Sequence, residues 1–336
     1  MISTRFTTML NIRHPIVQAG LGGVARAELV AAVSNAGGLG VLGMIRMTPD
    51  FIREQIRKTR ELTSHPFGVN LVPPVVPETG FESQLAVCIE ERVAVVSLFW
   101  CDAAPYVPQC HAAGIKVMLQ VGSAEAARQA AALGVDIIVA QGMEAGGHVH
   151  GQVGLLPLLP TIVEAVEPTP VLAAGGIVNG RGLAAALSLG AEGVLVGTRF
   201  VASQECEAHA HYKQRLIEAT ELDTVYCEVF HLGWPPHSPH RVLRNALTDG
   251  QPPPPGPVAH LHRAGQTVEV PPFASTTPSI HTVGRTELMS NYAGQGVGLL
   301  REILPAAEIV ERMVREAEQA IRGGGRQSSW PVERQS

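Results

Sequence analysis

The chain alternates short apolar runs with alanine-rich or amphipathic stretches. Four stretches show this unit most clearly, at residues 29–43, 110–122, 130–142 and 183–197. In each, a glycine follows the alanine-rich run, where a left-handed residue commonly ends a helix. The run after that glycine is rich in Val, Ile and Leu and too short for a helix. It therefore predicts a strand that is buried on both faces of a parallel sheet.

The same rhythm predicts eight strand–helix units. The strands are expected near residues 15–19, 39–43, 67–71, 93–98, 115–121, 135–140, 170–174 and 192–197. The helices are expected at about 24–36, 49–62, 78–90, 103–113, 123–133, 155–166, 181–189 and 203–219. Eight such units fit a (β/α)8 TIM barrel. An open, doubly wound parallel sheet is the alternative fold.

The rhythm stops after residue 220. Proline-rich segments at 231–240 and 251–260 predict irregular structure, and the pattern is helical again over 297–321. We therefore expect a barrel at 1–220 and a smaller C-terminal irregular and helical domain at 221–321 that caps it. Residues 322–336 are rich in glycine and polar residues and predict a disordered tail.

Composition narrows the class of protein. Hydrophobic residues make up 46% of the chain and charged residues 16%, which suits an α/β protein with a large core. The net charge is −5 and no stretch is strongly basic, so neither a nucleic-acid partner nor a membrane partner is expected. The five cysteines include no CxxC pair, which argues against a disulfide framework and a zinc site. With no long apolar run and no secretion signal, the sequence predicts a soluble cytoplasmic protein.

Three neutral amides stand at the carboxyl ends of predicted strands, where TIM barrels place their chemistry. Asn70, Gln120 and Gln141 each end an apolar run. An amide both donates and accepts hydrogen bonds, so the three suit a flat heterocycle with alternating N–H and C=O groups. Pairing with neighbouring loop backbone is the alternative. Gln18, at the end of the first strand, is a further candidate contact.

Glycines mark the ends of the last two predicted strands. Gly175 and Gly176 follow the seventh strand, and Gly197 and Thr198 follow the eighth. Barrels bind phosphate at these two loops, because backbone N–H groups converge there and glycine lets a phosphate approach them. Tight packing between strand and helix is the alternative.

The stretch EAGGHVHG at 144–151 follows the sixth predicted strand, on the same face. The missing side chains of Gly146 and Gly147 would let a flat ligand lie against the backbone, with His148 beside it. A histidine there suits proton transfer or the positioning of an anion. A structural role for His148 and a His-x-His metal pair with His150 are alternatives. No further ligands stand at the strand ends, so no metal site is predicted.

Several stretches together resemble the nitronate monooxygenase family of FMN-dependent TIM barrels. They are HPIVQAGLGGVARAELVAAVSNAGGLGVLG (14–43), FGVNL (67–71), QGMEAGGHVHG (141–151), AAGGI (173–177) and LVGTRF (195–200), with PHRVLRN (239–245) and YAGQGVGLL (292–300) toward the C-terminus. The resemblance implies that Asn70, Gln120 and Gln141 contact the flavin ring. It implies flavin and phosphate contacts from Gly146, Gly147, Gly175, Gly176, Gly197 and Thr198. It makes His148 the active-site histidine.

The resemblance also implies a reaction, in which FMN-dependent oxidation of a small alkyl nitronate by O2 gives a carbonyl compound and nitrite. An FMN-dependent enoyl-acyl-carrier-protein reductase that uses NAD(P)H is an alternative, because it resembles this family in barrel and GGH motif. A non-catalytic flavin-binding protein and a sugar-phosphate barrel enzyme without flavin remain open as well. The sequence does not indicate the oligomeric state.

Overall fold

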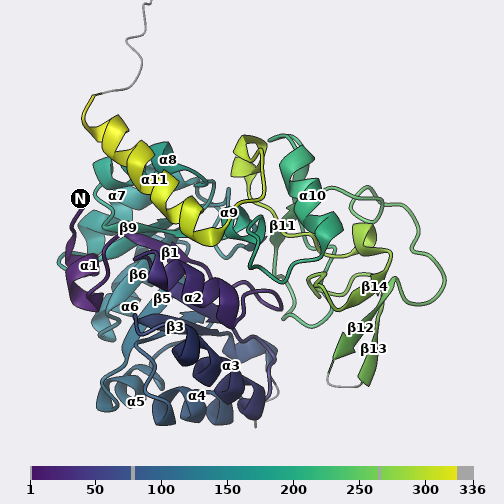
Figure 1. The fold of residues 1–336 in the computed structure, drawn as a ribbon, viewed down its shortest axis with the longest axis horizontal. Coiled ribbons are helices and arrows are strands. Elements are labelled where there is room, and N and C mark those ends of the chain that lie inside the picture. Colours follow the sequence, from purple (N-terminus) through teal and green to yellow (C-terminus); the bar gives the residue numbers. More distant parts are fainter. Residues whose placement is uncertain (1, 77–79, 264–265, 324–336) are drawn as a thin grey trace, which may run out of the picture.

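A closed parallel barrel forms the body of the molecule in the computed structural model, which describes residues 2–76, 80–263 and 266–323 (Figure 1). Its strands are β1 (Ile16–Gln18), β2 (Gly40–Gly43), β3 (Phe67–Leu71), β4 (Val95–Phe99), β5 (Lys116–Val121), β6 (Ile137–Gln141), β8 (Val171–Ala174) and β9 (Gly193–Val196). They pair in the order β1-β9-β8-β6-β5-β4-β3-β2. The barrel closes where Gln18 N donates to Leu39 O over 2.9 Å and Leu39 N donates to Ile16 O over 2.9 Å. The predicted TIM barrel is confirmed, and the open sheet is excluded.

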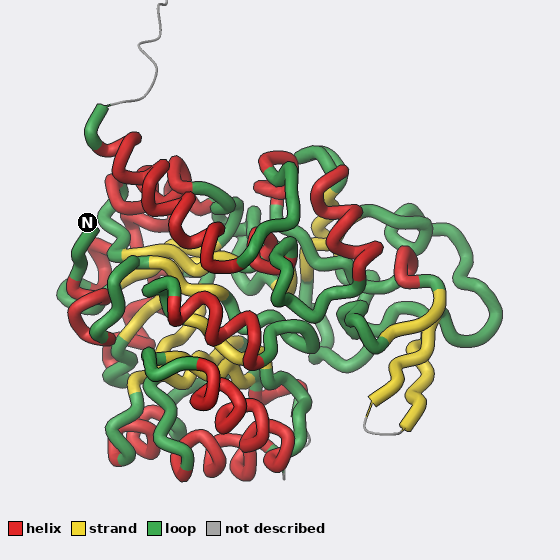
Figure 2. The backbone as a smooth tube through the Cα atoms, in the orientation of Figure 1, coloured by secondary structure: helices red, strands yellow, loops and turns green. Residues whose placement is uncertain are grey.

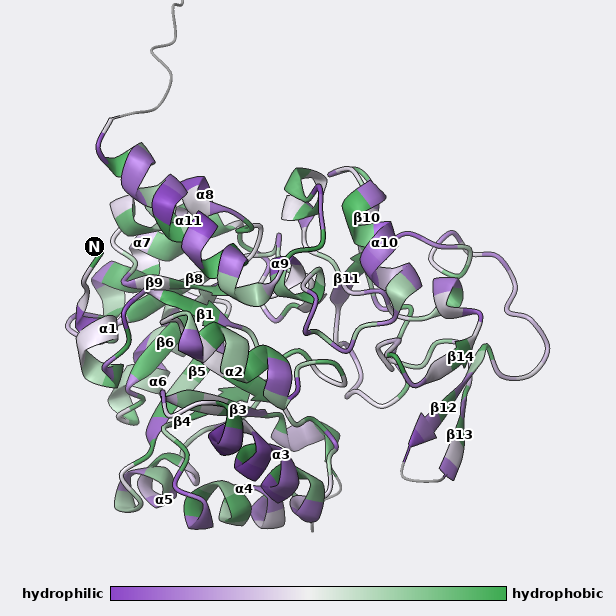
Figure 3. Cartoon of the chain, viewed as in Figure 1, coloured by the Kyte–Doolittle hydropathy of each residue, from purple (hydrophilic) through white to green (hydrophobic). Residues whose placement is uncertain are grey.

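Helices surround the barrel (Figure 2). They are α2 (Ala27–Asn35), α3 (Pro49–Leu62), α4 (Phe81–Glu90), α5 (Val107–Ala112), α6 (Ala124–Ala132), α7 (Leu155–Val166) and α8 (Gly180–Ser188). Helix α3 shows why these segments are helical. Thr48 accepts a hydrogen bond from Phe51 N, and Pro49 occupies the first helical position, where its missing N–H costs nothing. The outer surface of α3 is hydrophilic, whereas the barrel strands are hydrophobic (Figure 3).

The sequence did not reveal the N-terminal helix α1 (Arg5–Leu10). Its Phe6 and Leu10 join a buried apolar cluster with residues from the barrel strands, such as Val95 and Ile137. Phe6 N donates to the Glu192 carboxylate, which stands just before β9. Helix α1 therefore covers the end of the barrel opposite the predicted active site.

The helix predicted at 203–219 differs from the observed structure. A short helix α9 (Thr198–Val201) follows β9. Helix α10 (Ala210–Glu218) begins after its N-cap His209, whose side chain accepts a hydrogen bond from His211 N. Helix α10 packs against two short 3-10 helices, η2 (Thr286–Leu288) and η3 (Gln295–Leu299). Helix α11 (Ala306–Ile321) lies along α8 and α2 instead, on the outside of the barrel (Figure 1).

The prediction of irregular and helical structure missed two small antiparallel sheets. The chain between α10 and α11 contributes all of their strands except β7. One contains β10 (Thr224–Cys227), β11 (His240–Leu243) and β7 (Gly147–His148), and the other contains β13 (Gln266–Val270), β12 (Ala259–Arg263) and β14 (Thr282–Gly284). A third 3-10 helix, η1 (Pro73–Val75), follows β3. The residue range 224–300, which we call the cap, therefore pairs directly with the loop that carries His148.

The division into a barrel domain at 1–220 and a capping domain at 221–321 stays a prediction. Helix α11, which that division assigns to the second domain, packs on the barrel helices α8 and α2. Most of the tail predicted to be disordered, residues 324–336, lies outside the described residues. Within the described part of the chain, no helix combines the length and the apolar character that crossing a membrane requires.

Candidate active site

A cavity of about 760 Å³ opens at the carboxyl ends of the barrel strands and is covered by the cap. The barrel contributes one wall, and the cap contributes the other through residues such as Trp234, Ser275 and Tyr292. Nearly all the predicted site residues line this cavity: Asn70, Gln120, Gln141, Gly146, Gly147, His148, Gly175, Gly176, Gly197 and Thr198. The structure therefore brings together residues from five strand ends.

Gln18 is the exception. Its side-chain amide accepts a hydrogen bond from Val41 N over 3.1 Å and donates to Val41 O over 3.2 Å, and it is fully buried. This amide joins β1 to β2 where the barrel closes. Gln18 thus has a structural partner away from the cavity, and the predicted cofactor contact is not supported at this position.

Two of the three strand-end amides also bind backbone groups. Gln141 Nε2 donates to His148 O over 2.9 Å, and its Oε1 accepts from His150 N over 3.3 Å. Asn70 Nδ2 donates to Ser97 O over 3.1 Å. Gln141 therefore fixes the backbone on both sides of Val149, and with it the position of the His148 ring.

The two glycines before His148 serve different purposes. A Cβ on Gly146 would lie 2.5 Å from Gly294 N and 2.6 Å from the Ala293 carbonyl carbon, so the cap backbone rests directly on Gly146. Gly147 has a φ of 81°, which favours glycine, and a Cβ there would meet nothing within 4 Å. The open space for a ligand is therefore at Gly147, whereas Gly146 serves the contact between barrel and cap.

The predicted phosphate loops line the same cavity. Gly175 and Gly176 adopt φ values of 110° and 70°, which are backbone conformations that other residues rarely adopt. A Cβ on Gly197 would have its nearest neighbour, Leu21 Cδ2, at 3.5 Å. Thr198 Oγ1 accepts a hydrogen bond from Gly294 N over 3.0 Å, which ties this loop to the cap.

His148 is a buried, neutral histidine. Its ring stacks on Trp234 with 3.4 Å between centroids and 14° between planes, and only 7% of the residue is exposed. Burial lowers the pKa of His148 to about 2, and the charges of His240 and Arg46 act in the same direction. Its buried Nε2 has no hydrogen-bond partner among the described residues. The ring therefore has one nitrogen without a hydrogen-bond partner in the described chain, and it carries no formal charge.

His240 faces His148 across the β7–β11 pairing, with 5.1 Å between ring centroids. Its Nε2 accepts from Phe230 N over 3.1 Å, and its Nδ1 donates to Ser238 O over 3.2 Å. Burial lowers the pKa of His240 to about 4. Both nitrogens of His240 are thus used inside the cap, and the ring serves as a neutral wall behind His148.

Glu144, the acidic residue of the motif, caps a helix. Both of its carboxylate oxygens accept from Leu155 N over 2.9 Å, at the start of α7. Its backbone O accepts from Gln295 N over 2.9 Å. The carboxylate is thus committed to α7 and is no acidic partner for His148.

Sequence reasoning missed the residues that complete the surroundings of His148. Trp234 and Tyr292 come from the cap, where no periodicity marked them. Arg46 follows β2, has a φ of 57° and donates to Ser275 Oγ over 3.1 Å and to Gly233 O. Arg46 lies three residues after Gly43, the last residue of β2, so a search of the loop after this strand would have found it.

These features fit a bound flavin nucleotide. The cavity volume lies within the range of about 300–1,000 Å³ that is typical of cofactor sites. His148 and Gly147 both line this cavity, and a Cβ on Gly147 would meet nothing within 4 Å, so a flat ring system there could contact both residues.

Comparisons with known proteins agree with this description. The family model described as nitronate monooxygenase matches residues 3–79 and 73–316. A nitronate monooxygenase of Pseudomonas aeruginosa is 33% identical over 359 residues, which cover 94% of this chain and 99% of that protein.

Two further relatives carry other names. The (3aS,4S,5R,7aS)-5-hydroxy-7a-methyl-1-oxo-octahydro-1H-indene-4-carboxyl-CoA dehydrogenase of Mycobacterium tuberculosis is 40% identical over 250 residues, covering 74% of this chain and 68% of that protein. The solved structure of FabK from Thermotoga maritima superposes with a TM-score of 0.79 at 33% identity, covering 96% of this chain and 98% of that one. Members of this group are flavin enzymes that use FMN. The extent of the family match and the shared barrel show that the chain belongs to the nitronate monooxygenase family of flavin-dependent oxidoreductases.

Proposed function

We propose that this protein binds FMN in the cavity and oxidises alkyl nitronates with O2 to a carbonyl compound and nitrite. The observation that carries the proposal is His148, which lines the cavity and whose buried Nε2 has no hydrogen-bond partner in the described chain. Asn70, Gln120 and Gly147 would contact the flavin ring. Gly175, Gly176, Gly197 and Thr198 would hold its phosphate.

The side chains have limited and definite tasks in this reaction. Bound FMN supplies the electron-transfer chemistry. Because its pKa is low, His148 is neutral and a weak proton acceptor, so its main task is to donate a hydrogen bond to a nitronate oxygen in the tautomer that carries the proton on Nε2. The stacked Trp234 excludes water from one face of the imidazole and fixes its orientation. A role for His148 as a cation that attracts the nitronate is disfavoured by its lowered pKa.

The test compares His148→Ala with wild type. We expect the wild-type protein to purify yellow with FMN and to release nitrite from propyl-2-nitronate. The variant should keep its FMN and lose turnover by about 10²–10⁴-fold, the usual range for a positioned acid or base. If His148 is a base, turnover of neutral 2-nitropropane should fall more than turnover of its nitronate.

His150→Ala is the matched control, since His150 is exposed, lies two residues away and is not part of the cavity wall. It should keep wild-type rates. A colourless protein that does not take up added FMN would contradict the flavin assignment. Wild-type nitrite release by His148→Ala would remove His148 from the chemistry.

A second candidate is FMN-dependent reduction of an enoyl thioester by NAD(P)H. The cavity favours it in one respect, because Phe51, Leu261 and Arg263 line it as well as His148, and a small nitronate does not need all of this space. The similarity to a carboxyl-CoA dehydrogenase supports a thioester substrate as well. NAD(P)H consumption with crotonyl-CoA, measured beside nitrite release from propyl-2-nitronate, separates the two candidates.

A further inference from the structure

We propose that the cavity has a second subsite, which binds an anionic group at the end of the substrate distant from His148. The chemistry is that of a phosphate or a carboxylate on a chain, and Arg263 is its main ligand. The subsite, which we call the arginine end, consists of Arg26, Met47, Phe51, Glu207, Arg263 and His281, all on the cavity wall. The proposal rests on the proposed function in that this ligand shares the cavity with the flavin.

Arg263 is a cation whose donors are nearly unused among the described residues. Its guanidinium carbon lies 4.4 Å from the centroid of the Phe51 ring, and Nη2 lies 2.6 Å from Met47 Sδ. A thioether sulfur is a weak acceptor. No carboxylate of the described chain comes within 4.0 Å of this guanidinium, although Glu207 and Glu54 oppose the lowering of its pKa by burial. Stacking on an aromatic ring leaves the edge of a guanidinium free for two parallel bonds to an oxyanion.

Arg26 adds a second positive charge to the same aromatic ring. It is 5% exposed, and its guanidinium carbon lies 5.2 Å from the Phe51 centroid. Arg26 Nη1 donates to Gly43 O over 2.7 Å, which fixes the side chain to the barrel. Arg26 therefore supports the local positive field, while Arg263 has the free donors.

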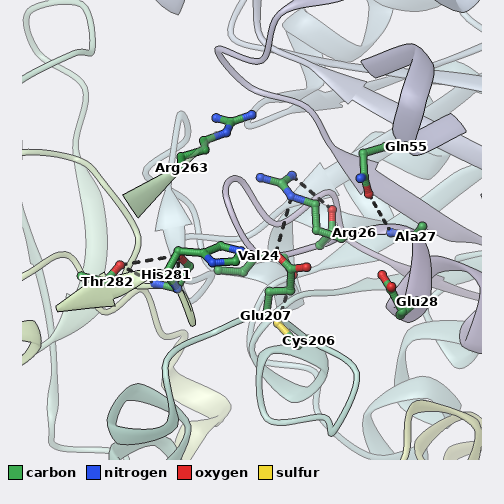
Figure 4. Close-up of polar contacts among 12 residues, drawn as sticks. Val24, Arg26, Ala27, Glu28, Gln55, Cys206, Glu207, Arg263, His281 and Thr282 are labelled. Carbon is green, nitrogen blue, oxygen red and sulfur yellow. Dashed lines mark hydrogen bonds and ion pairs between the residues drawn. The ribbon is translucent and has the colours of Figure 1, made fainter. Parts of the chain in front are cut away.

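The ion pair between Glu207 and Arg26 is long (Figure 4). Glu207 Oε2 lies 3.9 Å from Arg26 Nε and 3.9 Å from His281 Nε2, and both distances are near the outer limit for an ion pair. A ligand oxyanion could form shorter bonds than these. Glu207 therefore competes with the ligand, and removing its charge should tighten binding.

The surroundings determine the kind of molecule that carries the anion. Leu261, Val24 and Val72 contribute apolar wall beside the arginine end, and Phe51 contributes an aromatic face. An apolar chain that ends in an oxyanion matches this wall, with its reacting end toward His148. A neutral short-chain substrate would leave Arg263 without a partner.

The experiment measures binding to the FMN-loaded protein with two matched pairs of probes. The phosphate pair is 4′-phosphopantetheine against pantetheine, and the carboxylate pair is hexanoate against 1-hexanol. We expect the charged member of one pair to bind about 10- to 100-fold more tightly, the range for a hydrogen bond to a charged group. The pair that shows this preference identifies the anion.

Variants assign the preference to Arg263. Arg263→Met keeps an apolar stem on Phe51 and should reduce the preference to within about threefold, and Arg263→Lys should keep part of it. Glu207→Gln should increase the preference several-fold, which a merely disrupted site could not do. Arg285→Met is the control: Arg285 is paired with Glu287 at 3.2 Å, lies outside the cavity wall and should change nothing.

Two outcomes overturn the subsite: no preference for either charged probe in wild type, or a preference that survives in Arg263→Met. Nitrite release from propyl-2-nitronate should be unchanged in Arg285→Met, because Arg285 lies outside the cavity wall. If wild type releases no nitrite, the proposed function fails while the probe pairs still decide the subsite.

Discussion

At the scale of single residues, His148 and His240 couple folding to pH. Both have a folded-state pKa, about 2 and about 4, that is lower than the value of about 6.5 expected in the unfolded chain. Their stabilising contribution is therefore complete above pH 6.5 and is lost as the pH falls toward the folded-state values. Near pH 5 unfolding must take up a proton at each of the two positions.

We expect His148→Gln to remove about one of these protons. The free energy of unfolding, measured by urea titration between pH 4.5 and 6, should then rise with pH less steeply, by about 1.4 kcal/mol per pH unit. His65→Gln, at an exposed position, should keep the wild-type slope. An unchanged slope in His148→Gln would mean that the imidazole is already protonated in the folded protein.

At the scale of elements, the short pairing of β7 with β11 holds the loop that carries His148 against the cap. Gly146→Ala should disturb it, because the new Cβ would lie 2.5 Å from Gly294 N, closer than atoms can approach. We expect a loss of about 1–3 kcal/mol in the free energy of unfolding, as for other overpacked positions, and weaker FMN binding.

Gly294→Ala tests the same contact from the other side, since its Cβ would lie 2.9 Å from Gly146 N. Because both variants separate the same two segments, their effects should not add in the double variant. Additive losses would show that the two glycines act independently.

The elements that could be predicted are those whose evidence is local. The strands of the barrel are buried on both faces, so their Val- and Ile-rich runs mark them wherever they occur. Strand β11 is HRVL, and it is a strand because it pairs with β10 along its length and with Gly147 and His148, some 90 residues earlier in the chain.

The candidate site shows the same limit. Its barrel wall was predicted because strand ends converge in a TIM barrel, and its glycines stand at those ends. Trp234 could not be found, because nothing in a proline-rich segment indicates a stack on a histidine. Gln18, predicted as a cofactor contact, bonds to Val41 where the barrel closes. A strand-end amide can face either the cavity or this closure, and the sequence does not distinguish the two.

At the scale of the whole molecule, α11 joins the C-terminal part of the chain to the barrel. Gly180 N donates to Glu316 Oε2 over 2.8 Å, and a Cβ on Gly180 would lie 2.2 Å from Met313 O, so α8 and α11 are in direct backbone contact. Met313 is 2% exposed at this interface.

Met313→Ala should therefore lower the free energy of unfolding by about 2–5 kcal/mol, because it leaves a cavity between two helices. Urea unfolding with matched slopes gives the value. Arg315→Ala, on the outer face of the same helix, should stay within about 0.5 kcal/mol of wild type. Equal losses in both variants would indicate damage to α11 itself and not to its packing.

The cavity wall comes from two parts of the chain, so the ribosome makes one part of the wall before the other. The barrel side of the wall ends with Tyr212, and the cap side begins at Trp234 and ends with Gly296. A ribosome therefore releases all eight barrel strands before it makes the surface that covers His148. Because the N-terminal part of a chain is made first, we expect a stage of synthesis at which the carboxyl ends of the barrel strands are still open to solvent. We therefore expect the enclosure of the cavity, and of any cofactor in it, to be a late step in biogenesis.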